Sequence, residues 1–183
     1  MSRRKPPRRG SHIRKGLADT SAPSGSRGGE GSFKAAVAAT PTIASAHHPG
    51  VQALLPADKK RLAGAEQATG SLALDDALKA AFPNANRWDY GIGLPAAKGE
   101  QVLWLEVHHA ASGETDRVIR KLQWLKEWLR NEAPALDRMP AKFIWQLSNS
   151  ESNPNDRRKR QQLAEKHGLR RHHGVLDLAQ LVG

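Results

Sequence analysis

Three ionisable residues, Asp89, Glu106 and His108, lie in two neighbouring apolar segments of the chain. Asp89 directly precedes the segment YGIGL, and Glu106 lies within QVLWLEVHHA. A carboxylate inside an apolar segment costs several kcal/mol unless it is paired, hydrogen-bonded or bound to a cation. The two carboxylates therefore indicate either strand ends that reach solvent or a site for a divalent metal ion.

The segment 101–110 has the composition of a β-strand, rich in β-branched and large apolar residues. Because side chains alternate between the two faces of a strand, Glu106 and His108 are predicted to project from one face and His109 from the other. The adjacent histidines are therefore not expected to chelate one metal ion. His109 is expected to face the core or to form a hydrogen bond.

The clearest predicted helix covers residues 114–131, where apolar residues recur with the spacing of one helix face. Periodicity and turn residues elsewhere give the order α-β-β-α-β-α-β, which implies an α/β fold with a mixed sheet flanked by helices. The predicted elements are a helix at 72–82 capped by Ser71, strands at 89–94 and 101–110, a helix at 114–131, a strand at 141–148, a basic helix at 153–168, and a strand, a helical turn or both at 174–182.

The same periodicity predicts which residues form the centre of the core. They lie on the two longer predicted strands and on the helix between them, where the apolar pattern is strongest. These residues are Leu103, Leu105, Val107, Val118, Leu122, Leu125, Leu129, Phe143 and Ile144.

The composition limits the class of protein. The chain has 183 residues and no cysteine, which excludes disulfides and thiolate metal sites. No apolar run approaches the length of a membrane span, and no signal-peptide core follows the basic start. We expect a soluble cytoplasmic protein without a membrane partner. Nothing in the sequence indicates an oligomeric state.

Most of the net charge of +11 lies in the first part of the chain. Residues 1–70 carry 12 Lys and Arg against 4 Asp and Glu. Residues 1–50 have few large apolar residues and are predicted to be a disordered basic tail, 51–70 a linker or extra helix, and 71–183 the folded domain. The tail is expected either to bind nucleic acid or to act only as a solubilising extension. Its candidate nucleic-acid-binding residues are Arg3, Arg4, Lys5, Arg8 and Arg9.

A second basic segment opens the predicted helix at 153–168. Positive charge at a helix start opposes the helix dipole, so the cations there are expected either to contact phosphate or to form a solvated face. The candidate nucleic-acid-binding residues in this segment are Arg157, Arg158 and Arg160.

The stretch WDYGI, a loop, a strand ending in LEVHHA, a basic amphipathic helix and another strand together resemble the PD-(D/E)xK superfamily of restriction-endonuclease-like nucleases. The resemblance covers roughly residues 71–150 and implies a restriction-endonuclease-like core. It implies that Asp89 is the first acidic residue of the motif and Glu106 the acid of the E-x-K step. His108 would then occupy the lysine position, and Trp88 stands where the motif has proline.

The resemblance also implies a reaction, the metal-dependent hydrolysis of a phosphodiester bond in DNA or RNA. A hard divalent cation, Mg²⁺ or Mn²⁺, neutralises the charge that develops on the phosphate. Asp89, Glu106 and the carbonyl of Val107 would hold the cation. His108 would orient or deprotonate the attacking water. The alternative is a catalytically inactive nuclease-fold protein that binds nucleic acid or another partner.

Overall fold

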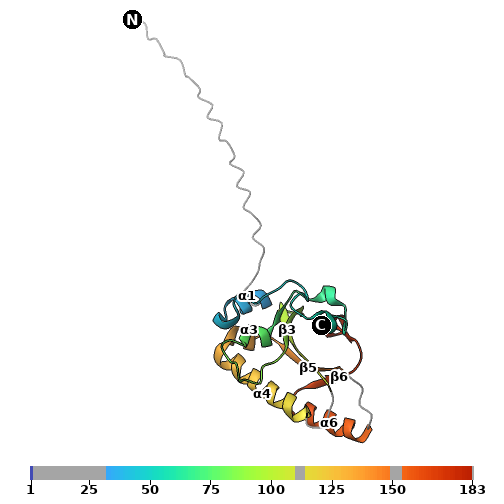
Figure 1. The fold of residues 1–183 in the computed structure, drawn as a ribbon. Helices are drawn as coiled ribbons and strands as arrows, with labels where there is room; N and C mark the ends of the chain where they lie inside the picture. Colours follow the sequence, from blue (N-terminus) through green and yellow to red (C-terminus); the bar gives the residue numbers. More distant parts are fainter. Residues whose placement is uncertain (2–31, 110–113, 149–153, 183) are drawn as a thin grey trace.

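A five-stranded mixed sheet with β4 at its centre organises the described part of the chain (Figure 1). The computed structural model describes Met1 and residues 32–109, 114–148 and 154–182. Strand order is β2-β3-β4-β5-β6, with antiparallel pairing from β2 to β4 and parallel pairing from β4 to β6. The strands are β2 (Gly70–Ala73), β3 (Tyr90–Pro95), β4 (Glu100–His108), β5 (Ala141–Leu147) and β6 (Arg170–His172). The predicted mixed α/β sheet is confirmed.

A tight loop joins β3 to β4, as the segment PAAKGE predicts. Ala96 N–H donates to the carbonyl of Gly99 at 3.0 Å, and Gly99 has a φ of +83°. This left-handed conformation is accessible to glycine without the steric cost that other residues incur. The loop therefore sets the antiparallel register of the two strands that carry Asp89 and Glu106.

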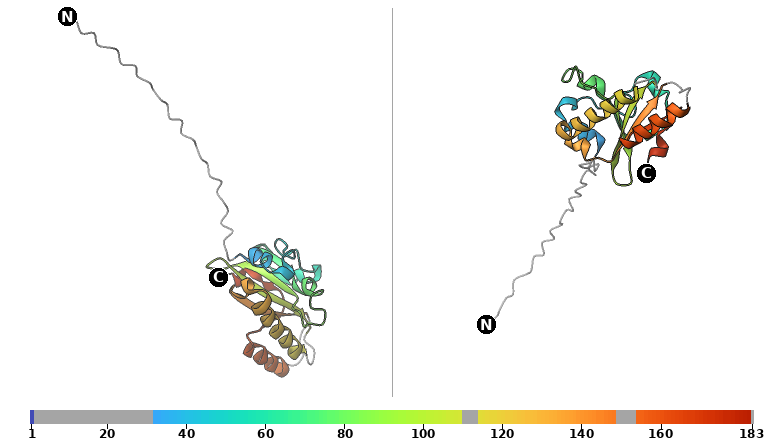
Figure 2. Two further views of the ribbon diagram at one scale, coloured as in Figure 1. Left: turned by 90° about the vertical axis from the view of Figure 1, so that its left-hand side faces the viewer. Right: turned by 90° about the horizontal axis from the view of Figure 1, so that it is seen from below.

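Helix α4 (Glu114–Glu132) is the crossover that parallel pairing of β4 and β5 requires. Its 19 residues present a buried apolar stripe to the sheet, which includes the predicted Val118, Leu122, Leu125 and Leu129. Helices α5 (Pro134–Asp137) and α6 (Pro154–Lys166) follow it. Figure 2 shows α4 and α6 on the same side of the sheet. None of the helices in the described ranges is long and apolar enough to cross a lipid bilayer.

Two apolar clusters cover the two faces of the sheet, and β4 contributes alternate residues to each. Val102 and Trp104 pack toward the helices, whereas Leu103 and Leu105 pack toward the other face. The alternation predicted for this strand is therefore confirmed as far as His108. All nine predicted core residues are buried or pack against the buried clusters, with Val107 and Phe143 only partly buried.

The folded domain begins earlier than residue 51, so the predicted disordered tail is wrong for residues 33–50. Helix α1 (Phe33–Ala38) is capped by Ser32, whose Oγ accepts from Ala35 N–H at 3.1 Å. Phe33 is fully buried and packs so closely on β3 that a Cβ at Gly93 would lie 2.7 Å from the Phe33 Cβ. Val37 and Ile43 are buried as well, so a few apolar residues anchor a segment whose average composition is that of a tail. A 3₁₀ turn, η1 (Pro41–Ile43), follows α1.

The predicted helix at 72–82 is also corrected. Residues 70–73 form β2, which pairs with β3, and only α3 (Leu74–Leu78) is helical. Ser71 lies opposite Ile92 in the sheet and does not cap a helix. The pairing with β3 buries Leu72 completely, and this outweighs the local helix propensity of the segment.

The face of the sheet away from α4 is covered by two segments far apart in the sequence. The predicted linker at 51–70 contains α2 (Pro56–Lys59), β1 (Leu62–Ala63) and η2 (Ala65–Gln67), and runs into β2. The chain end forms β7 (Leu176–Asp177), which pairs with β1 in parallel, and η3 (Leu178–Leu181). The predicted strand or helical turn at 174–182 is therefore both. Strand β6 was not predicted.

Candidate active site

Two polar residues on the sheet face that carries Glu106 contact two polar residues on α4. Glu114, Val118 and Lys121 follow one another at helical spacings of four and three residues, and so share a face of the helix. On β4, Glu106 and His108 share a face because they are two residues apart. Lys121 contacts Glu106, and Glu114 contacts His108. Two polar contacts therefore lie between this strand and this helix.

The first contact is a three-residue charge cluster of Asp89, Glu106 and Lys121. Lys121 Nζ donates to Asp89 Oδ1 at 3.1 Å and to Glu106 Oε1. The side chain of Glu106 is fully buried, while those of Lys121 and Asp89 are 14% and 24% exposed. One ammonium thus joins two carboxylates at the edge of an apolar core. Asp89 and Glu106 therefore lie close enough together to share one ammonium.

The backbone holds the two carboxylates in place as well. Asp89 and Glu106 lie one step beyond the last paired residues of β3 and β4, which are Tyr90 and Leu105. Val107 N–H donates to Asp89 Oδ2 at 2.9 Å, and Asp89 N–H donates to Glu106 Oε2 at 3.3 Å. Each carboxylate therefore accepts from the strand that carries the other, which fixes their separation.

Burial strongly perturbs the protonation of this cluster. The pKa of Glu106 is raised from 4.5 to about 8, chiefly by burial and then by the charge of Asp89, against the opposing effect of Lys121. Burial alone would lower the pKa of Lys121, but the charges of Glu106 and Asp89 more than offset this and raise it. Near neutrality Lys121 is therefore charged, and Glu106 is mostly protonated.

A cavity of about 260 Å³ lies beside Asp89. Its acidic lining consists of Asp58, Asp75, Asp76 and Asp89. Asp58 accepts from the hydroxyl of Tyr90 at 2.7 Å. Asp75 pairs with Arg87 at 2.8 Å. The carboxylate of Asp89 therefore has a solvent-accessible side next to further acidic groups.

His108 is oriented by Glu114 and makes no hydrogen bond to Asp89, Glu106 or Lys121 in the described part of the chain. Its Nε2 lies 2.5 Å from Glu114 Oε2, with both side chains largely buried. Its carbonyl accepts from the indole N–H of Trp145 at 3.1 Å. The structure thus places Lys121, rather than His108, in direct contact with both carboxylates.

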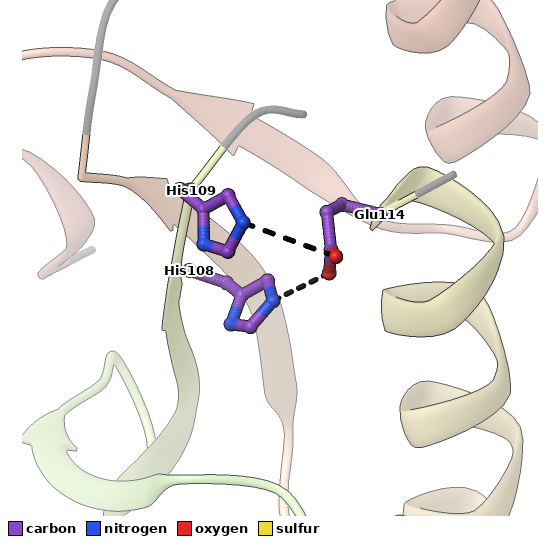
Figure 3. Close-up of side chains that lie close together, drawn as sticks. All are labelled: His108, His109 and Glu114. Carbon is purple, nitrogen blue, oxygen red and sulfur yellow. Dashed lines mark hydrogen bonds and ion pairs between the residues drawn. The ribbon is translucent and has the colours of Figure 1, made fainter. Parts of the chain in front are cut away.

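His109 does not face the core, so the first of the two alternatives predicted for it is wrong. Strand β4 ends at His108, and the alternation of side chains ends with it. The rings of His108 and His109 stack with centroids 4.6 Å apart, and the His109 side chain is 51% exposed. Both rings lie beside Glu114 (Figure 3). These three residues form a group that could hold a metal ion.

The predicted nucleic-acid-binding residues fall into two sets. Arg3, Arg4, Lys5, Arg8 and Arg9 lie outside the described residues. On α6, Arg157 and Arg158 are exposed and Arg160 is partly buried. The beginning of this helix therefore offers at least two guanidinium groups to a partner.

Lys121 and Glu114 were not predicted as site residues, although the sequence carries a signal for both. Lys121 follows Val118 by three residues and precedes Leu125 by four, and Glu114 precedes Val118 by four. These spacings place both charged residues on the face that the apolar stripe buries. A charged residue at such a position indicates a buried partner on the facing strand.

Comparisons with models of known protein families, with curated proteins and with solved structures found no match for this chain.

Proposed function

We propose that this protein hydrolyses phosphodiester bonds of DNA or RNA with a divalent cation, Mg²⁺ or Mn²⁺, held by Asp89 and Glu106. The observation that carries the proposal is the convergence of these two carboxylates, from neighbouring strands, on the ammonium of Lys121. Two carboxylates and an ammonium at one buried position carry a desolvation cost, and such clusters of perturbed groups are typical of functional sites. In phosphodiester hydrolysis, carboxylates hold the cation and an ammonium stabilises the charge on the phosphate.

The donor atoms at this position fit a hard cation. Asp89 and Glu106 each direct one oxygen at the same positive centre, Lys121 Nζ, so both can serve one cation. Mg²⁺ prefers oxygen ligands and retains several waters, so two carboxylates suffice as side-chain ligands. The main chain of Val107 lies beside Asp89, to which its N–H donates, and its carbonyl is the third ligand in this proposal. The bound cation supplies neutralisation of the phosphate and leaving oxygens.

Lys121 has a separate role in this proposal. Its ammonium remains charged across the physiological range because both carboxylates raise its pKa. A fixed positive charge beside the cation site stabilises the negative charge that develops on the phosphate during hydrolysis. Lys121 thus provides, from α4, the residue type that the sequence motif would place at position 108.

His108 is the proposed base. When its Nε2–H donates to Glu114, Nδ1 is the nitrogen that can accept a proton. In the hydrolysis, water forms a bond to phosphorus and gives its proton to His108, the bond between phosphorus and the leaving oxygen breaks, and solvent returns a proton to that oxygen. Glu114 keeps the imidazole oriented and stabilises its protonated form.

The topology supports the same proposal. A nuclease-like core would place the first acidic residue at the start of the second strand of an antiparallel meander and the second on its third strand. Here Asp89 directly precedes β3, Glu106 lies on β4, and β2 supplies a short first strand. Helix α4 and the parallel strand β5 follow in the order that the resemblance implies.

A second candidate function is the binding of nucleic acid without cleavage. The observation that favours it is that Glu106, whose pKa is about 8, carries a proton near neutrality, so Lys121 balances the remaining charge of Asp89 without a metal ion. The exposed Arg157 and Arg158 of α6 would then contact phosphate.

The experiment that separates the two functions incubates the protein with single- and double-stranded DNA and RNA in Mg²⁺, Mn²⁺ or EDTA. We expect cleavage that EDTA abolishes and that Asp89→Asn, Glu106→Gln and Lys121→Met each remove. Arg120→Met is the matched control, since Arg120 is the exposed neighbour of Lys121 on α4. Binding without cleavage under every condition supports the second function, and cleavage that survives Glu106→Gln contradicts the first.

A further inference from the structure

His108, His109 and Glu114 form a second polar cluster, separate from Asp89, Glu106 and Lys121. They lie where β4 ends and α4 begins, with both imidazole rings turned toward the carboxylate (Figure 3). His108 Nε2 is 2.5 Å from Glu114 Oε2, and His109 Nε2 is 3.9 Å from Glu114 Oε1. One ligand atom from each residue lies within 4.8 Å of the other two.

We propose that these three side chains bind a transition-metal ion of the Zn²⁺ class. Zinc bonds to imidazole nitrogen and carboxylate oxygen at about 2.0–2.2 Å, so tetrahedral ligand atoms lie about 3.3 Å apart. The two ligand separations on Glu114, 2.5 and 3.9 Å, lie on either side of that value. Lengthening the separation of His108 from Glu114 and shortening that of His109, each by less than about 1 Å, brings the three side chains around one ion.

The donor set distinguishes this site from the proposed Mg²⁺ site. Imidazole nitrogen suits Zn²⁺, Cu²⁺ and Ni²⁺, whereas Mg²⁺ prefers oxygen. Glu106 and His108 are two residues apart on β4, about 6.6 Å along the strand. Two cation sites of different chemistry would therefore lie next to each other under α4. The inference concerns binding alone and does not depend on catalysis.

Three protein ligands leave one position of a tetrahedral ion open. His109 is 51% exposed, whereas His108 and Glu114 are 20% and 15% exposed, so the open position lies on the solvent side. Sites of this kind hold an exchangeable water or an anion. The Trp145 indole, which donates to the carbonyl of His108 at 3.1 Å, holds the main chain at the buried side.

A charge interaction alone explains this geometry less completely. Glu114 pairs with His108, and Arg117 Nη1 lies 3.9 Å from the same carboxylate oxygen. An ion pair accounts for these two contacts. An ion pair does not account for the stacking of His109 on His108, which brings two imidazole rings, each able to carry a positive charge, together beside one carboxylate. A metal ion uses both rings.

The test is a titration of the full chain, purified without a histidine tag, with Zn²⁺ by calorimetry and with Co²⁺ by visible absorption. The variants are His109→Ala and Glu114→Gln. His48→Ala is the matched control, since His48 is an exposed member of another His-His pair. Asp89→Asn tests whether the ion binds at the other cluster.

We expect one Zn²⁺ per chain at this site and a tetrahedral Co²⁺ spectrum. His109→Ala and Glu114→Gln should each weaken binding at least tenfold, because loss of even an outer-shell partner typically costs 10–100-fold. His48→Ala and Asp89→Asn should bind as the unmodified protein does. His109 is exposed, so its variant is expected to fold, and melting curves check this. No Zn²⁺ binding by the unmodified chain, equal binding by His109→Ala, or loss of binding in Asp89→Asn would overturn the proposal.

Discussion

The buried carboxylate of Glu106 forms an ion pair with Lys121, across the interface of β4 and α4. Asp89 joins the pair from the neighbouring strand and shares the same ammonium. Removing one partner of a buried pair leaves an uncompensated charge, which typically costs about 3–5 kcal/mol. The stability of the domain and the proposed hydrolysis therefore depend on the same three side chains.

We predict that Lys121→Met destabilises the protein more at pH 9 than at pH 5. Without the ammonium, Glu106 and Asp89 are two adjacent carboxylates, and the loss is on the order of 3–5 kcal/mol when both are ionised. At pH 5, Glu106 carries a proton, because burial raises its pKa to about 8, and the loss is smaller. Urea unfolding at the two pH values measures this. Equal destabilisation at both would contradict the assigned protonation, and Arg120→Met should change neither.

Glu106 makes the stability of the unmodified protein depend on pH in a defined direction. Its pKa is about 8 in the folded state and 4.5 ordinarily, so the folded protein binds more protons between these values. The contribution of Glu106 to the free energy of unfolding is then fully present below about pH 4.5 and is lost as the pH rises toward 8. Glu106→Gln cannot titrate, so its stability relative to the unmodified protein should rise across this range, by on the order of a few kcal/mol.

Thermal melts of both proteins from pH 5 to pH 9 measure the difference. Glu132→Gln, which changes an exposed carboxylate at the end of α4, should retain the pH profile of the unmodified protein. Parallel profiles for Glu106→Gln and the unmodified protein would show that Glu106 is ionised throughout.

The core prediction concerns Leu122, which is 1% exposed on the face of α4 toward the sheet. Leu122→Ala should cost about 2–5 kcal/mol through lost burial and the cavity that remains. Leu163→Ala on α6 is the control, because Leu163 is 37% exposed, and it should change stability by about 0.5 kcal/mol or less. Chemical denaturation measures both, and equal effects would contradict the packing of α4.

The elements with strong periodicity were predictable from the sequence, and the short ones were not. Helix α4 and strand β4 carry apolar patterns long enough to identify both their type and their buried face. Strands β2 and β6 have four and three residues, and their pairing partners, not their own residues, decide their conformation. Phe33 is a similar case, since tertiary contacts such as its close packing on Gly93, and not its neighbours in the sequence, show that its segment belongs to the domain.

The site was predictable in part for the same reason. Alternation predicts Glu106 and His108 on one face, and the hairpin register places Asp89 opposite Glu106, but Lys121 was not predicted as a site residue. Its spacing from Val118 and Leu125 indicates the buried face. The predicted orientation of His109 is wrong because alternation ends with the strand, and one residue decides where that end lies.

The basic segment before the domain offers a test of nucleic-acid binding. Residues 2–31 contain eight Lys and Arg against two Asp and Glu, and their removal takes away none of the described core residues. We expect this deletion to leave the melting temperature unchanged, to weaken binding, and to lower the slope of log affinity against log salt, since each phosphate contact contributes about 0.9. Filter binding at several salt concentrations measures it, and an unchanged slope would exclude these residues from the interface.

The last prediction joins the two cation sites and depends on both proposals. His108→Ala should slow Mg²⁺-dependent hydrolysis by about 10²–10⁴-fold, because a positioned base typically contributes that much. When Zn²⁺ is bound by His108, His109 and Glu114, His108 cannot act as the base. Zn²⁺ should therefore inhibit the unmodified protein in the presence of Mg²⁺. His109→Ala retains His108 but lacks one zinc ligand, and it should keep its activity at Zn²⁺ concentrations that inhibit the unmodified protein.

Initial rates at fixed Mg²⁺ and increasing Zn²⁺ measure this difference, with His48→Ala as the control that should be inhibited normally. Equal inhibition of His109→Ala and the unmodified protein would place the inhibitory ion elsewhere, with displacement of Mg²⁺ from Asp89 and Glu106 as the direct alternative. That alternative predicts relief of inhibition by excess Mg²⁺, whereas zinc at the histidine site is insensitive to Mg²⁺ because imidazole ligands disfavour it. The magnesium dependence of the inhibition therefore identifies the site at which zinc acts.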